Sequence, residues 1–127
     1  MGTTSQLVTK SPVRLVIQLS DFVLQAKKRP RLGRHGNVYS PTAKHEMTLA
    51  WCMRAQVGAV TLTGDVRLTL RCNYSRGDLD NYIKTVCDAL EKSAIITNDR
   101  QIVEIVAKKC VDHGLYIEIE EDKRCQL

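Results

Sequence analysis

The residues whose types and spacing most clearly suit a chemical reaction lie in residues 76–104, the segment RGDLDNYIKTVCDALEKSAIITNDRQIVE. Asp78 and Asp80 are two positions apart where a glycine-containing loop enters a helical pattern, and Lys84 follows one helical turn later. A further aspartate, Asp99, precedes the next apolar run. Carboxylate oxygens are the ligands that Mg²⁺ prefers, the ion neutralises charge on a phosphate, and an ammonium stabilises a developing oxyanion. The set is typical of metal-assisted phosphodiester hydrolysis.

The spacing favours convergence of these groups. In extended backbone, residues i and i+2 point the same way, so Asp78 and Asp80 can face one ion, and both lie at the positive end of the helix dipole. At about 100° per residue, Asp80, Lys84 and Asp88 form a row on one flank of the helix, away from its apolar stripe. Simpler interpretations stay open. Asp80 could cap the helix, Lys84 could form only an ion pair with Asp88, and Asp99 could belong to an ordinary turn.

The first half of the chain contains the pattern of a strand and a helix separated by a basic loop. Alternating and paired apolar residues predict a strand within 13–24. The following residues are rich in Lys, Arg, Gly and Pro and predict a largely irregular segment. Ser40 and Pro41 predict the N-cap and first residue of a helix that ends near Gly58.

The second half predicts the remaining elements. Residues 60–72 alternate between apolar and polar and predict one bulged strand or two short strands, and an apolar stripe predicts a helix from Leu79. Two final strands are expected at 102–110 and 115–119, with a turn at 112–114 between them. The order β-α-β-α-β-β predicts an α+β fold, a mixed sheet of about four to five strands with two helices packed on it.

Length and composition indicate one ordinary globular domain. The 127 residues are expected to form a single domain, with residues 1–11 flexible. No apolar run approaches the roughly 18 residues of a membrane span and no signal-peptide pattern is present, which predicts a cytoplasmic protein without membrane association. Five widely spaced cysteines without a CxxC pair argue against a disulfide framework or a zinc site. Cys87 is expected to be buried on the apolar face of the second helix.

The net charge of +5 is concentrated near the N-terminus. Residues 1–50 carry eight basic and two acidic side chains, whereas residues 51–127 carry eleven and twelve. The clustered basic residues are Lys27, Lys28, Arg29, Arg31 and Arg34. Such a cluster is typical of contacts with DNA phosphates, and the alternative is a solvated charged loop. Tyr39 and Tyr82 are candidates for stacking on bases, but 5% aromatic residues supply no base-reading platform.

With these motifs in place, the sequence resembles the RusA family of Holliday junction resolvases, endonucleases that nick four-way DNA junctions. The matching motifs are Asp78-Leu79-Asp80-Asn81 with Lys84, then Asp88-Ala89-Leu90, and Asp99 at the family's spacing. Family-like residues in the first half are Arg29-Pro30-Arg31, Tyr39-Ser40-Pro41 and Glu46. The resemblance spans residues 27–109. Two departures are that the acidic turn reads Asn98-Asp99 rather than Asp-Asp, and that residues 74–77 are less basic than in some members.

The resemblance implies a homodimeric, Mg²⁺-dependent, structure-selective endodeoxyribonuclease of bacterial or phage origin, with Mn²⁺ as an alternative ion. It would nick four-way junctions symmetrically in recombination and repair. Asp78, Asp80 and Asp99 would hold the metal, and Lys84 would be the catalytic lysine. The residues expected to contact branched DNA are Lys27, Lys28, Arg29, Arg31, Arg34 and Arg76. Two other functions stay open: a non-catalytic nucleic-acid-binding module, and a metal-dependent nuclease for another branched DNA or RNA.

Overall fold

The computed structural model describes residues 13–73, 77–111 and 114–122, so Arg76 and the flexible segment expected at 1–11 lie outside it. The strands are β1 (Arg14–Leu19), β2 (Arg31–Leu32), β3 (Val38–Tyr39), β4 (Val66–Asn73), β5 (Ile102–Cys110) and β6 (Leu115–Glu121). The helices are α2 (Ala43–Val57), α3 (Leu79–Lys92) and the short 3-10 helix η1 (Asp99–Gln101). The predicted α+β class and the order of the main elements are confirmed, and a small β2–β3 hairpin and η1 are added to them.

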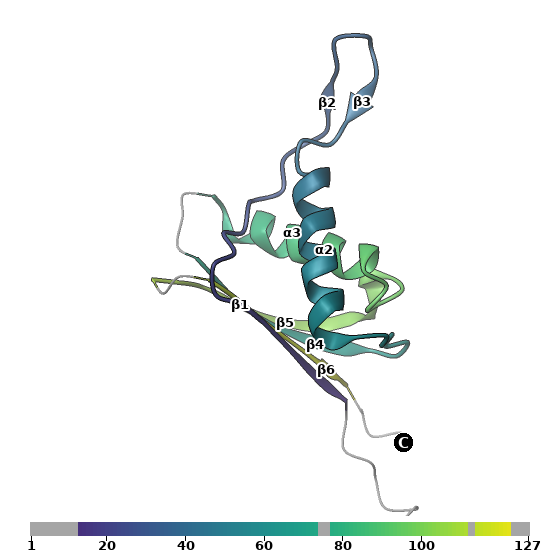
Figure 1. Cartoon of the computed structure of the whole chain (residues 1–127), viewed down its shortest axis with the longest axis vertical. Coiled ribbons are helices and arrows are strands. Elements are labelled where there is room, and N and C mark those ends of the chain that lie inside the picture. The colour runs from purple at the N-terminus through teal and green to yellow at the C-terminus, as the bar shows by residue number, and fades with distance from the viewer. Residues whose placement is uncertain (1–12, 74–76, 112–113, 123–127) are drawn as a thin grey trace, which may run out of the picture.

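Four strands form a mixed sheet in the order β1-β6-β4-β5, and α2 and α3 cover one of its faces (Figure 1). β4 pairs with β5 in parallel and with β6 in antiparallel orientation. A parallel pair needs a crossover connection, and α3 supplies it between β4 and β5. β5 and β6 lie on opposite sides of β4 and do not pair with each other, and residues 112 and 113 of the turn expected between them lie outside the described residues.

The core lies between this sheet and the two helices. Every second residue of β4 is buried, as are Leu115, Ile117 and Ile119 of β6, which is the alternation expected of a strand with one covered face. The strands contribute the buried apolar residues Ile17, Val66, Leu68, Leu70, Cys72, Leu115, Ile117 and Ile119. The helices contribute Leu49, Ala50, Met53, Val86, Ala89 and Leu90. α3 is therefore fixed along its length by its apolar face, and its opposite flank faces solvent.

Two predicted boundaries differ from the structure. α2 begins at Ala43 with Thr42 as N-cap, because a turn in which the Ala43 N–H donates to the Ser40 carbonyl (3.2 Å) comes first. The strand expected over residues 60–72 is β4 and begins only at Val66. Leu62, which precedes it, makes only an isolated bridge with Ile96.

The basic segment contains a hairpin that projects from the body beyond the N-terminal end of α2 (Figure 1). We call residues 28–39 the basic arm. Its strands pair Arg31 with Tyr39 and Leu32 with Val38. Gly36, at φ 82°, takes the left-handed backbone conformation that glycine adopts most readily and so allows the tight turn.

Candidate active site

The first turn of α3 presents Asp78 and Asp80. Asp78 is the N-cap residue, with extended backbone at φ −72° and ψ 140°, but its side chain makes no capping hydrogen bond. Asp80, which could have been the cap, lies inside the first helical turn instead. Both residues are exposed, and within the described part of the chain neither carboxylate takes part in a hydrogen bond or ion pair. Their oxygens are therefore available to a ligand, at the helix end that favours negative charge.

Close packing around residue 77 requires the glycine that precedes Asp78. A Cβ atom at Gly77 would lie 2.9 Å from both the Ala26 Cβ and the Tyr82 hydroxyl, which is too close for any side chain. The loop entering α3 is thereby packed against residue 26, and Lys109 Nζ donates a hydrogen bond to the Gly77 carbonyl. Tyr82 is buried in this contact and is not available to stack on a base.

Lys84 lies between two carboxylates. Its Nζ is 3.5 Å from Asp88 Oδ1 and 3.8 Å from Asp99 Oδ2, and its side chain stays 53% exposed. The ion pair with Asp88 that the helical spacing predicted is confirmed. In addition, the structure places Asp99 next to Lys84, so the predicted catalytic lysine and one predicted metal ligand are neighbours.

Asp99 is held by local backbone structure that the sequence analysis missed. Its N–H donates to Glu91 Oε2 at 2.7 Å, and it opens η1 directly after the cap residue Asn98. The Asn98 side chain accepts from the Arg100 N–H at 2.8 Å, and the Gln101 side chain accepts from the Asn98 N–H at 3.0 Å. The Asn-x-x-Gln spacing is the signal of a capping box and gives Asn98 a structural role. The sequence could also have pointed to Glu91, because the helical period places it on the same side of α3 as Asp80 and Lys84.

The three predicted metal ligands are not gathered at one point. Among residues 13–73, 77–111 and 114–122, no three Asp, Glu, His or Cys side chains are grouped so that they could hold one metal ion. Lys84 contacts Asp99, whereas Asp80 lies in the first turn of α3, one turn before Lys84, and Asp78 is the N-cap residue that precedes the helix. The joint metal site of Asp78, Asp80 and Asp99 therefore stays a prediction.

Cys87 lies behind this acidic flank. It is buried, as its place on the apolar stripe predicted. Burial raises its pKa to about 11, and the nearby negative charges of Asp99 and Asp88 add to this effect. The thiol is therefore neutral near pH 7, which makes Cys87 a packing residue rather than a nucleophile.

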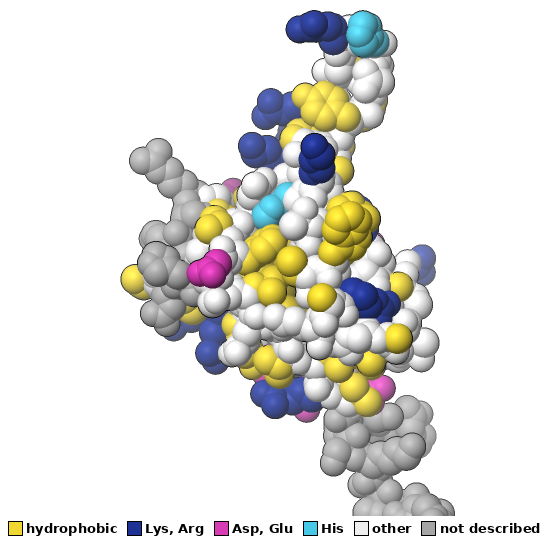
Figure 2. All heavy atoms as spheres, in the orientation of Figure 1, with side chains coloured by type: hydrophobic (Ala, Val, Ile, Leu, Met, Phe, Trp, Pro, Cys, Tyr) yellow, Lys and Arg dark blue, Asp and Glu magenta, His cyan; other side chains and the backbone are white. Residues whose placement is uncertain are grey.

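The predicted DNA-binding residues divide into two groups. Lys28, Arg29, Arg31 and Arg34 are exposed on the basic arm. Figure 2 shows Lys and Arg side chains (dark blue) spread along the arm, away from the body. Lys27 is different, because its Nζ is 2.6 Å from Glu46 Oε2 and 3.0 Å from Asp88 Oδ2, and its side chain is only 22% exposed. Arg76, the sixth, lies outside the described residues.

Glu46 is a fully buried acid whose role sequence reasoning missed. Its carboxylate accepts from Lys27, from Lys92 Nζ at 2.5 Å and from Thr42 Oγ1 at 3.2 Å. Although burial opposes ionisation, the hydrogen bonds from the two lysines keep the pKa of Glu46 below its ordinary value. A signal existed, since Glu46 shares the spacing of the buried face of α2 with Leu49 and Met53.

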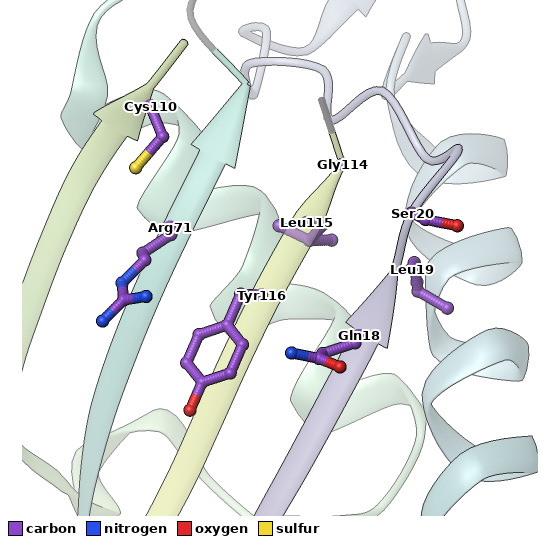
Figure 3. A pocket seen from close by; sticks show the side chains of 8 residues that line it. All are labelled: Gln18, Leu19, Ser20, Arg71, Cys110, Gly114, Leu115 and Tyr116. Carbon is purple, nitrogen blue, oxygen red and sulfur yellow. The ribbon is translucent and has the colours of Figure 1, made fainter. Parts of the chain in front are cut away.

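A shallow pocket of about 540 Å³ lies at one end of the sheet, apart from these carboxylates (Figure 3). Arg71 lies over the ring of Tyr116, with its Cζ 5.1 Å from the ring centroid, and Gln18 and Cys110 flank them. None of the predicted site residues lines this pocket.

Comparison with known proteins agrees with the motif in α3. A family model described as Endodeoxyribonuclease RusA matches residues 21–120, which include Asp78, Asp80, Lys84 and Asp99. Among curated proteins, none matches the chain. Within the described residues, no helix has the length and apolar character needed to cross a membrane. Because the family model covers most of the sequence, the chain belongs to the RusA family of endodeoxyribonucleases.

Proposed function

We propose that the protein is a Mg²⁺-dependent, structure-selective endonuclease that nicks four-way DNA junctions. One observation carries the proposal: the exposed Asp78 and Asp80 lie at the start of α3, and Lys84 follows one helical turn later beside Asp99, in a chain that the RusA model matches. These are the residue types that phosphodiester hydrolysis needs, placed at the start of α3, in its second turn and at the start of η1.

In this proposal Asp78, Asp80 and Asp99 hold Mg²⁺, with Mn²⁺ as an alternative. Their donor atoms are carboxylate oxygens, which match a hard divalent cation. Three carboxylates repel one another, so their convergence depends on the cation itself. The ion that they would hold would supply positive charge to offset that of the scissile phosphate and would make water more acidic.

Lys84 stabilises the negative charge that develops on the phosphate oxygens. Its ammonium is half-exposed, so it can approach a substrate without being removed from a buried ion pair. Its distances of 3.5 Å to Asp88 and 3.8 Å to Asp99 exceed those of close charge-assisted hydrogen bonds, about 2.8 Å. The ammonium is therefore near the acidic site but not locked to either carboxylate.

The basic arm is the proposed surface for the DNA backbone. Arg29, Arg31 and Arg34 are exposed and suit phosphate contacts, which position a protein on DNA without reading its sequence. Tyr82 is buried, and Tyr39 is the exposed aromatic residue of the arm. This composition favours recognition of DNA shape over base reading.

The proposed active form is a homodimer. A four-way junction has two equivalent strands related by a two-fold axis, and a C₂ dimer presents two copies of one site in matching symmetry. β5 lies at one edge of the sheet and exposes Val103, Ile105 and Val106, a surface that a second copy could cover.

The direct test uses labelled four-way junction, linear duplex and flap DNA, each with Mg²⁺, Mn²⁺ or EDTA. We expect paired nicks in the junction with either ion, none with EDTA and little cleavage of duplex. Junction binding without cleavage under all conditions would support the non-catalytic module instead. Preferred cleavage of flaps or of branched RNA would replace the junction as substrate but leave the metal chemistry in place.

A further inference from the structure

A continuous chain of charges runs from Lys92, at the C-terminal end of α3, through the buried Glu46 to the flank of α3 that carries Lys84. In order, its members are Lys92, Glu46, Lys27, Asp88, Lys84 and Asp99. Lys27 is the link between the two halves, because it contacts both the buried Glu46 and the partly exposed Asp88.

The position of Lys27 is fixed by backbone contacts to α3. Its N–H donates to the Asn81 carbonyl at 2.9 Å, and Thr85 Oγ1 donates to the Gln25 carbonyl at 2.8 Å. The close contact between Gly77 and Ala26 holds the same segment from the other side. Lys27 therefore lies along α3 and belongs to the body of the molecule, whereas Lys28 begins the exposed arm.

Asp88 has two cationic neighbours, and they are not equivalent. Lys27 Nζ lies 3.0 Å from one carboxylate oxygen, whereas Lys84 Nζ lies 3.5 Å from the other. The Asp88 side chain is 16% exposed, so its charge is only weakly screened by water. Without Lys27, the attraction between Asp88 and Lys84 would lack a competitor, and the i,i+4 spacing would let them form a close ion pair.

We propose that Lys27 is a positioning residue for Lys84 and not a DNA-phosphate contact. By engaging Asp88, Lys27 keeps the Lys84 ammonium half-exposed and able to reach the scissile phosphate. Glu46, held by Lys92, fixes Lys27 from the buried side. This inference rests on the proposed catalytic role of Lys84.

The experiment compares Lys27→Met with Lys28→Met, which removes the same charge one residue away. We expect Lys27→Met to lower kcat for junction nicking about tenfold, as is usual when a group that orients a reactive side chain is lost. Its KM and the salt dependence of junction binding should change little. Lys28→Met is expected to raise KM instead. Circular dichroism and thermal unfolding identify any loss of fold.

A rescue variant and a second readout separate this mechanism from a structural role. Adding Asp88→Asn to Lys27→Met removes the carboxylate that would capture Lys84, so most of the kcat should return. The rate at which an amine-reactive reagent acylates Lys84, mapped by mass spectrometry, should fall in Lys27→Met and recover in the double variant. This rate is measured without DNA or metal.

Two results would overturn the inference. In the first, Lys27→Met weakens junction binding but leaves kcat unchanged. In the second, the double variant is as slow as Lys27→Met, and the rate of Lys84 acylation is the same in both variants as in the parent protein. A failure of the proposed function is recognised separately, by full nicking activity in Lys84→Met. In that case acylation of Lys84 in the Lys27→Met protein still decides whether Lys27 controls its environment.

Discussion

At the residue scale, the three aspartates of the proposed metal site have different surroundings. The carboxylates of Asp78 and Asp80 make no hydrogen bond or ion pair with the described residues, whereas Asp99 is oriented by the hydrogen bond from its N–H to Glu91. Substitutions at the first two should therefore affect chemistry with little effect on folding. A substitution at Glu91 should act through Asp99.

We expect Asp80→Asn to lower Mg²⁺-dependent nicking by at least about 100-fold, because the amide removes the charge that holds the cation. Junction binding should be largely retained. Since the Asp80 carboxylate makes no interaction with the described residues, the free energy of unfolding should change by no more than about 0.5 kcal/mol. Asp65→Asn, an exposed change before β4, is the matched control. Full activity in Asp80→Asn would remove Asp80 from the ligand set.

Glu91 gives a prediction about positioning. Glu91→Gln keeps an oxygen that can accept from the Asp99 N–H, whereas Glu91→Ala leaves that N–H without its partner. We expect nicking to fall about tenfold in Glu91→Ala and much less in Glu91→Gln, measured as kcat on a four-way junction. Equal losses in the two variants would mean that the charge of Glu91, not its hydrogen bond, matters.

At the element scale, the basic arm and the network around α2 and α3 use lysine and arginine in different ways. The arm exposes its charges, whereas Lys27 and Lys92 neutralise the buried Glu46 between the two helices. The attraction of the arm for DNA should therefore depend on the salt concentration. The stability that the helix network provides should depend on pH, through the ionisation of the buried Glu46 carboxylate.

For the arm, we expect the triple change Arg29→Gln, Arg31→Gln and Arg34→Gln to weaken junction binding and flatten its salt dependence. Each lost phosphate contact should reduce the slope of log K against log salt concentration by about 0.9. The control replaces three exposed basic residues elsewhere, Lys44, Arg100 and Lys108, and so removes the same net charge. Similar slopes for both triple variants would show that the arm acts only through overall charge.

For the helix network, we expect Glu46→Gln to destabilise the fold by about 2 kcal/mol near pH 7, since it removes the charge that accepts hydrogen bonds from both lysines and leaves Lys27 with Asp88 alone. The pKa of Glu46 is lowered in the folded state. Its contribution to stability is therefore complete above the ordinary glutamate pKa and is lost as the pH falls through the lowered value.

Thermal unfolding between pH 7 and pH 3 measures this effect. The parent protein should lose more stability on acidification than Glu46→Gln does. The control Glu104→Gln changes an exposed residue of β5 and should follow the parent curve. Parallel curves for the parent and Glu46→Gln would show that the carboxylate is not the group responsible.

At the scale of the whole molecule, β1 and β5 are the edge strands of the sheet that the described residues form. β5 combines its edge position with exposed Val103, Ile105 and Val106. Sheet edges with apolar side chains favour association, and in the proposed mechanism one protomer supplies the residues for one nick.

We predict a homodimer that nicks two strands within one binding event. Sedimentation at micromolar concentration should give twice the protomer mass of 14.3 kDa. Ile105→Lys, which places a charge on the exposed part of β5, tests this edge, and Lys108→Glu on the same strand is the control for charge change alone. A monomer that still makes paired nicks would contradict the requirement for dimerisation.

The sequence by itself determined the local features of this protein. The apolar stripe of α3 and the alternation of β4 and β6 identified the covered faces, because periods of 3.6 and 2 residues follow directly from helix and strand geometry. The same local spacing placed Lys84 beside Asp88, and the motif DLDNxxK identified the family before any packing was known.

Only the tertiary structure decided which distant residues meet. Lys27 and Glu46 are 19 positions apart, and Glu46 and Lys92 are 46 apart, so no helical or strand period relates them. The placement of β5 beside β4, rather than beside β6, depends on the path of α3 across the sheet. The surroundings of Lys27 differ from those of Lys28 because packing against α3 brings one lysine to buried acids and leaves its neighbour in solvent.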